Sequence, residues 1–173
     1  MQPSLRHAIA AALCAASFPT AGCMEIGLTL KATVDNMNVN VEEKLLIASL
    51  DGSFDVKLEL GEQAGDSCEV SFSAFSLVRA DDGSDILSKN INALTETATP
   101  VTISPGNSRT ISFAIGELDE QQTQTTGMEL PKADYASICN AGPVRIVVGV
   151  QNSANGERPT PVRSKAFDVT GCT

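Results

Sequence analysis

Apolar and polar residues alternate along much of the chain, and this period of two is typical of strands with one buried and one solvated face. The clearest case is residues 101–115, where Val, Ile and Phe alternate with small polar residues on both sides of a Pro-Gly-Asn turn. If the two halves pair as a hairpin, Ile103 lies opposite Ile111 and Val101 opposite Phe113. An arch that joins strands of two different sheets fits the pattern equally well.

The same alternation predicts strands on the N-terminal side of this stretch, at residues 26–34, 45–50, 54–60, 70–79 and 86–93. Residues 36–40 are rich in turn formers and are expected to be a connector. Asp51-Gly52 lies between two of the strands and is the strongest short signal of a two-residue hairpin turn. Such a turn would place Ile47 opposite Val56.

The strand predicted at 70–79 loses its alternation near Phe75, which indicates a β-bulge or burial of both faces. The chain then turns at 81–84, where Asp, Gly and Ser are concentrated. The next strand is expected to return alongside, with Leu87 opposite Val78.

Residues 116–143 interrupt the alternation, and no strand pattern is visible in them. Pro131 is a suitable first residue for a short helix. A segment this long without strands is typically functional or disordered, so it is the candidate partner-binding loop. A flexible, solvated insert is the alternative. The candidate contact residues are Glu117, Asp119, Glu120, Gln121, Gln122, Met128 and Tyr135.

The last two predicted strands, 144–151 and 162–170, form a hairpin in which Val148 lies opposite Val162 or Ser164. Eight or nine short strands joined by turn-forming residues predict an all-β fold, an antiparallel β-sandwich, with a closed β-barrel as the alternative. The Pro-Gly turn between alternating strands resembles that of bacterial immunoglobulin-like and fibronectin-type-III-like domains. The resemblance is generic, and it implies the sandwich rather than a particular family.

The first 22 residues have the pattern of a secretion signal, with Arg6 and His7 before an apolar run too short to span a bilayer. The run is followed by Thr-Ala-Gly before Cys23, which resembles the bacterial lipoprotein signal, although Thr20 stands where Leu is usual. The resemblance implies that Cys23 carries lipid and anchors the exported protein in the cell envelope, as in outer-membrane lipoproteins. Ordinary cleavage near Gly22 would instead leave a periplasmic or secreted soluble protein.

The remaining residues, 23–173, are expected to form a single domain that contains the insert at 116–143. Export places their cysteines where disulfides persist. The C-terminal hairpin sets Cys139 opposite residues near 172, so a Cys139–Cys172 disulfide is expected. The alternative is an inter-sheet Cys68–Cys139 bond with Cys23–Cys172 as its complement.

Charge and composition exclude several classes of partner. Acidic residues outnumber basic ones by 21 to 12, and this field repels the phosphates of nucleic acids and of anionic lipids. We therefore expect no nucleic-acid binding, and membrane contact only through the lipid anchor. Aromatic residues make up 4% of the chain and Trp is absent, so the stacking platforms of carbohydrate-binding sites are missing.

The only His is His7, which lies in the signal. Cleavage of the signal removes His7, so the mature chain has no His for Ser-His-Asp or Cys-His catalysis or for a His-ligated metal. The acidic run at 81–85 has oxygen ligands suited to calcium, but Asp and Gly are favoured in tight turns for backbone reasons alone. A plain turn is expected there and at 51–53, and no catalytic residue, metal or cofactor is expected.

Three functions are consistent with these patterns. The first is a non-enzymatic, envelope-anchored β-sandwich module that binds another protein of the cell envelope or supports a surface assembly. The second is a secreted inhibitor or adhesin-like module acting through the 116–143 loop. The third and most remote is a small hydrolase that uses a carboxylate pair, a Ser-Lys dyad or a lone Cys.

Overall fold

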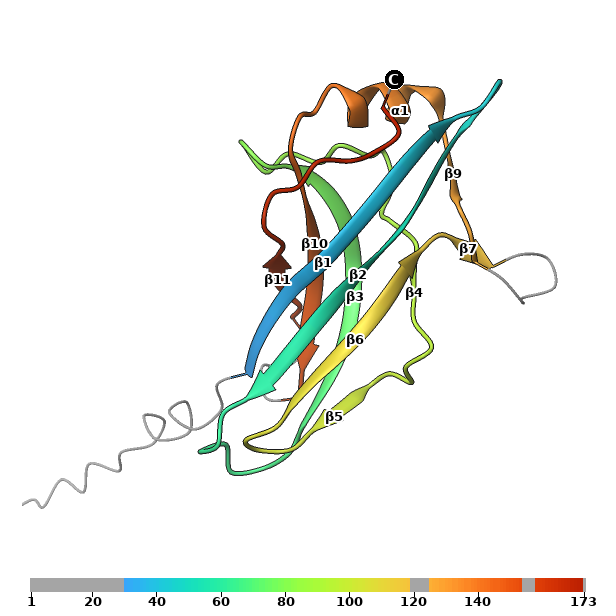
Figure 1. The fold of residues 1–173 in the computed structure, drawn as a ribbon. Helices are drawn as coiled ribbons and strands as arrows, with labels where there is room; N and C mark the ends of the chain where they lie inside the picture. The colour runs from blue at the N-terminus through green and yellow to red at the C-terminus, as the bar shows by residue number, and fades with distance from the viewer. Residues whose placement is uncertain (1–29, 119–124, 154–157, 173) are drawn as a thin grey trace, which may run out of the picture.

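A computed structural model describes residues 30–118, 125–153 and 158–172. The predicted secretion signal and Cys23 lie outside the described residues. Two antiparallel sheets pack face to face around one apolar core, which confirms the predicted all-β fold (Figure 1). Both sheets are open in the described part of the chain, so the alternative of a closed barrel is wrong.

The first sheet has the order β1-β2-β6-β4, and β9 pairs with the beginning of β2. Its strands are β1 (Leu30–Glu43), β2 (Ala48–Leu60), β4 (Ala93–Leu94), β6 (Ser108–Ile115) and β9 (Met128–Leu130). The second sheet has the order β11-β10-β3-β5, with strands β3 (Cys68–Arg79), β5 (Val101–Ile103), β10 (Val144–Asn152) and β11 (Thr160–Arg163). A small ribbon of β7 (Glu117–Leu118) and β8 (Thr125–Thr126) and one short helix, α1 (Lys132–Cys139), complete the described elements.

The core is made of aliphatic side chains from both sheets and a cluster of Phe rings. Phe113 lies at the centre of this cluster, with ring centroids 5.2 Å from Phe54, 5.2 Å from Phe72 and 5.1 Å from Phe75. Phe54 and Phe113 come from the first sheet, and Phe72 and Phe75 come from the second. The few aromatic residues of the chain therefore join the two sheets.

The hairpin predicted at 101–115 is wrong, and the arch is correct. Val101 pairs with Val70 in the second sheet, whereas Phe113 pairs with Phe54 in the first. The chain crosses from one sheet to the other at the Pro-Gly-Asn turn. The alternation is the same in either arrangement, because the inner face of each sheet contributes apolar residues to the shared core.

The hairpin turn predicted at Asp51-Gly52 is also wrong. These residues lie inside the continuous strand β2, opposite Asn40 and Val39 of β1. The real turn follows Glu43, at residues 44–47, where the N–H of Lys44 donates to the C=O of Ile47 at 2.8 Å.

The connector predicted at 36–40 is part of β1, and a shift of register marks a bulge between Asp35 and Asn38. Asn36 has φ 55°, a left-handed conformation that Asn tolerates better than most residues. The turn-forming residues of this segment therefore serve a bulge rather than a turn.

The second half of β3 also contains a bulge, as predicted. Ala74 has φ 50°, and the register with β10 shifts between Val147 and Gly149. The strand predicted at 86–93 is largely wrong: an isolated bridge joins Val78 to Asp85 rather than to Leu87. The segment continues along β3 through single backbone hydrogen bonds and enters a regular strand only at β4.

The insert at 116–143 contains more regular structure than its composition indicates. Met128 and Leu130 are buried on β9, and that strand pairs with β2, so the expectation of no strand in this region is wrong. The helix predicted to begin near Pro131 is confirmed as α1.

The C-terminal hairpin has one of the two predicted registers, with Val148 opposite Val162 rather than Ser164. Its second strand, β11, ends at Arg163, earlier than predicted, and the chain then crosses to the edge of β1, where Thr170 bridges Asn40. The predicted Cys139–Cys172 disulfide is present, with a Cα–Cα distance of 5.4 Å, and Cys68 is free and buried.

Candidate functional site

The three described residues of the predicted partner-binding loop do not gather at one place in the structure. Glu117 is half-buried on β7, Met128 is buried in the core, and Tyr135 on α1 packs against that core. The other four, Asp119, Glu120, Gln121 and Gln122, lie outside the described residues. Met128 therefore stabilises the fold and does not present its side chain to a partner.

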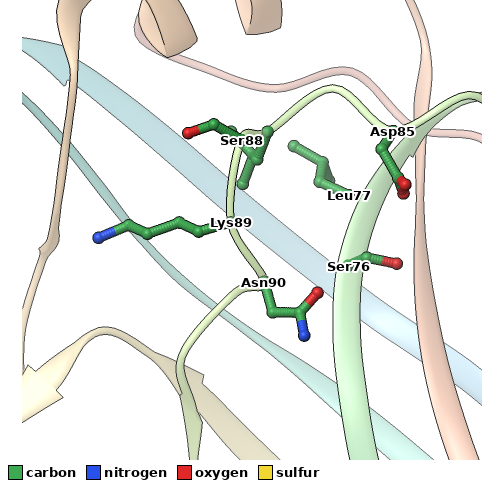
Figure 2. A pocket seen from close by; sticks show the side chains of 7 residues that line it. Ser76, Leu77, Asp85, Ser88, Lys89 and Asn90 are labelled. Carbon is green, nitrogen blue, oxygen red and sulfur yellow. The ribbon is translucent and has the colours of Figure 1, made fainter.

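A small pocket lies between β3 and the segment that follows its turn (Figure 2). Its volume is about 120 Å³, and its lining is Ser76, Leu77, Asp85, Leu87, Ser88, Lys89 and Asn90. Figure 2 shows Lys89 and Asp85 pointing in opposite directions, so their charges do not converge on a ligand. The space suits a few water molecules rather than an organic substrate.

The neighbourhood of this pocket has a structural role. Ser88 Oγ donates to Oδ2 of the buried Asp134 at 2.8 Å, which ties the segment to α1. This hydrogen bond compensates part of the cost of burying the Asp134 carboxyl.

The acidic turn at 81–85 satisfies its own polar groups. Asp82 Oδ1 accepts from the N–H of Ser84 at 2.8 Å, and Asp81 Oδ1 accepts from the N–H of Asp82 at 2.8 Å. The hydrogen bonds from Ser84 lower the pKa of Asp82 below its usual value. Within the described residues no group of three or more His, Cys, Asp or Glu side chains is placed to hold a metal ion.

The outer face of the first sheet carries most of the described ion pairs. Glu59 lies between Lys57 and Lys31, and the hydrogen bond and charge of Lys57 lower the pKa of the Glu59 carboxyl. On the same face Asn36 donates to Asp55 at 2.7 Å, and this bond is the main cause of the lowered pKa of Asp55. These groups are exposed and paired with one another, which is typical of a solvated face.

The tip of the β1–β2 hairpin is the most exposed apolar feature of the described surface. Leu45 is 88% exposed and Leu46 is 82% exposed, and both lie in the turn that joins the strands. Lys132 of α1 forms an ion pair with Glu43 at 3.2 Å, which connects the base of the tip to the helix. We refer to residues 44–47 as the hairpin tip.

The hairpin tip and the beginning of β1 lie at opposite ends of the molecule. β1 has 14 residues, so Leu30 is roughly 40 Å from the tip at the rise of an extended strand. Figure 1 shows the hairpin projecting past the sheets at the end where α1 lies. The tip is thus at the end of β1 opposite to Leu30.

Sequence reasoning missed this tip because residues 45–50 fit a strand. The signal that could have identified it is Leu46, which is out of phase with the apolar positions at Leu45 and Ile47. Three adjacent apolar residues after two Glu and a Lys interrupt the alternation of β1 and β2, as a turn does.

A larger hollow, of about 680 Å³, lies along β6, and Ser53 of the neighbouring strand β2 is part of its lining. Thr110, Ser112 and Phe113 of β6 line it, together with residues 94–97 and with Leu118 and Thr125 of the small ribbon. We refer to it as the β6 groove. Its lining combines hydroxyl groups with apolar side chains and includes Glu96 as its only charged residue among the described ones.

No helix in the described ranges is long and apolar enough to cross a membrane. No family model matches the sequence, and searches of curated proteins and of solved structures returned no match.

Proposed function

We propose that the protein is a non-enzymatic, envelope-anchored β-sandwich module that binds another protein of the cell envelope through the hairpin tip. The observation that carries the proposal is the pair of exposed leucines, Leu45 and Leu46, side by side at a projecting turn. Burial of a Leu side chain contributes about 1.5–3 kcal/mol, and neither leucine contributes this to the fold. A contact with an apolar surface of a partner would use both.

The charges beside the tip nearly balance, so its leucines define the surface that it fits. Glu43 pairs with Lys132 at 3.2 Å, and the exposed Lys44 of the tip lies close to Glu42 in the chain. A partner with an apolar depression would bury both leucines. An anionic lipid surface fits less well, because the chain as a whole is acidic and repels it.

The position of the tip is consistent with an anchor at Cys23. Only six residues, 24–29, separate Cys23 from the beginning of β1. A lipid at Cys23 would hold that end of the molecule near the membrane, and β1 would carry the tip roughly 40 Å away from it. The tip would then face proteins of the periplasm or of the other membrane of the envelope.

The tip is tested by placing a photo-activated cross-linking residue at position 46 and, as a control, at the exposed position 89. In the native host we expect one discrete cross-linked protein from position 46, and none of it from position 89. The purified partner should bind the L45S/L46S variant at least about tenfold more weakly than wild type, the loss expected from about 1.4 kcal/mol. The K89S variant, which changes an exposed side chain away from the tip, should bind as wild type. Equal binding by L45S/L46S would refute the role of the tip.

The anchor is tested separately by the Cys23→Ser substitution. Wild type is expected to partition into detergent with the membrane fraction, and C23S into the aqueous fraction. An unmodified N-terminus in the intact mass of the native protein would rule out the lipid and leave the proposal for the tip unaffected.

A further inference from the structure

The edge of β6 that faces away from β2 is covered over only a short length. β4 pairs Ala93 with Ile115 and Leu94 with Ala114, and the chain then leaves the sheet. β6 itself pairs with β2 along all its eight residues, from Ser108 to Ile115. On the side of β4, the rest of β6 is therefore an unpaired edge of the sheet within the described residues.

Two hydrogen bonds determine which backbone groups of β6 point to this edge. The N–H of Leu60 donates to the C=O of Asn107 at 3.0 Å, so odd-numbered residues of this ladder direct their backbone groups toward β2. The N–H of Gly116 donates to the C=O of Asn92 at 3.0 Å, so even-numbered residues direct theirs toward β4. The two directions alternate along an antiparallel strand, and the two observations agree.

Thr110 and Ser112 therefore direct their N–H and C=O groups outward beyond the end of β4. None of these four groups has a backbone partner in the described ranges. Both residues line the β6 groove, whose far wall is formed by residues 94–97. These unpaired backbone groups thus lie beside a hollow of about 680 Å³, and no segment among the described residues covers them.

The edge also lacks the features by which edge strands are usually protected. Residues 110–113 contain no Lys, no Pro and no bulge, and their register with β2 is regular. Phe113, which is 3% exposed, is one of the residues that line the groove, and Leu94 and Leu118 supply apolar side chains to the same lining.

We propose that the β6 groove binds an extended segment of a partner protein, which adds to the first sheet as a strand antiparallel to β6 and in line with β4. Its backbone would pair with Thr110 and Ser112, because only an extended chain presents donors and acceptors at the spacing of these groups. Its residues opposite Ile111 and Phe113 would turn inward and be apolar, and those opposite Thr110 and Ser112 would turn outward and be polar. The groove is separate from the hairpin tip and is tested by different variants.

The first experiment uses a fluorescent peptide of alternating Thr and Val, blocked at both ends, with the mature full-length protein. Binding is measured by fluorescence anisotropy. N-methylation of the Thr residues, whose amides face β6, should weaken binding at least about tenfold, while N-methylation of the Val residues, whose amides face away, should weaken it less. Failure of the parent peptide to bind, or equal loss with both methylated peptides, would refute the proposal.

The second experiment locates the binding by amide hydrogen exchange. In the free protein the amides of Thr110 and Ser112 should exchange much faster than those of Ile111 and Phe113, which are bonded to β2. Addition of the peptide should slow exchange at Thr110 and Ser112 specifically. Protection elsewhere, with no change at these two amides, would show that the groove is not the site.

The third experiment compares Thr110→Pro with Ala32→Pro. Both substitutions remove an N–H that points away from β2, at opposite edges of the same sheet, so neither removes a hydrogen bond of the β2 ladders. T110P should bind the peptide at least about tenfold more weakly, and A32P should bind as wild type. Equal binding by T110P overturns the proposal, and so would dimerisation of wild type that T110P abolishes, since the occupant would then be a second copy of the chain. If T110P does not fold, hydrogen exchange in the wild type decides.

Discussion

At the scale of single residues, Gly52 shows that a glycine can be required inside a strand rather than in a turn. It has φ 144° and lies within β2, opposite Val39, just past the bulge of β1. A Cβ placed there would lie 2.1 Å from the carbonyl oxygen of Asn38, far inside contact distance. The glycine is required by a close approach of two strands and by its positive φ, not by a chain reversal.

We predict that Gly52→Ala destabilises the protein by about 2 kcal/mol or more, since strain of this kind costs about 1–3 kcal/mol and the clash adds to it. Gly65→Ala is the matched control, because a Cβ at Gly65 meets nothing within 4 Å. The free energy of unfolding, measured by urea titration, should fall for G52A and stay near wild type for G65A. Equal stabilities of the two variants would show that the bulge adjusts to a side chain.

At the scale of elements, the C-terminal segment joins parts of the molecule that belong to different sheets. After β11 the backbone of Phe167 bonds to Val144 of β10. Farther along, the N–H of Val41 donates to the C=O of Thr170 at 2.9 Å, which places the segment on the edge of β1. The Cys139–Cys172 disulfide then fixes its end to α1. The segment thereby covers part of an edge that would otherwise be open.

Replacement of both cysteines, C139S/C172S, should lower the free energy of unfolding by about 3–4 kcal/mol, the entropy expected for a closed loop of this size. The cysteines are 33 residues apart. We also expect faster exchange of the Val41 amide, because the segment that accepts its hydrogen bond would be less restrained. Differential scanning calorimetry and hydrogen exchange measure these effects. An unchanged thermal midpoint, with Val41 still protected, would mean that the backbone bonds to β1 hold the segment without the disulfide.

At the scale of the whole molecule, the hairpin tip and the β6 groove are separate surfaces on a chain of high net charge. The N-terminal end of β1 and the hairpin tip lie at opposite ends of the first sheet (Figure 1). The β6 groove is lined by residues of that sheet and of the small ribbon, and none of the tip residues lines it. The chain has a formal net charge of −9, and its described ion pairs are on exposed side chains. Exposed pairs contribute little, so repulsion among the excess carboxylates is expected to dominate the electrostatic part of the stability.

We predict that the thermal midpoint rises by a few degrees as sodium chloride is increased from about 10 mM to about 200 mM, because salt screens this repulsion. An uncharged osmolyte at the same osmolality is the control for non-electrostatic effects. A midpoint that falls with salt would mean that the pairs of Glu59 with Lys31 and Lys57, and of Glu43 with Lys132, outweigh the net charge.

The sequence by itself determined the class of fold, the approximate places of most long strands and the short helix after Pro131, and it favoured the Cys139–Cys172 bond over the alternative Cys68–Cys139. Alternation reports which face of a strand is buried, and this depends on one strand and the core beside it. The preference for this disulfide came from one local hairpin, because both of its candidate registers set Cys139 opposite residues near 172, and the structure has the register with Val148 opposite Val162.

Only the tertiary structure decided which strands pair and which apolar residues are left outside. Val101 and Ile103 alternate identically in a hairpin or an arch, and their partners in β3 lie more than thirty residues earlier in the chain. Leu45 and Leu46 have the composition of core residues, yet they are exposed because the turn falls on them. The unpaired edge of β6 depends on where the distant segment β4 ends. Pairing is a competition among segments remote in sequence, whereas the alternation within a strand records only that one of its faces is covered.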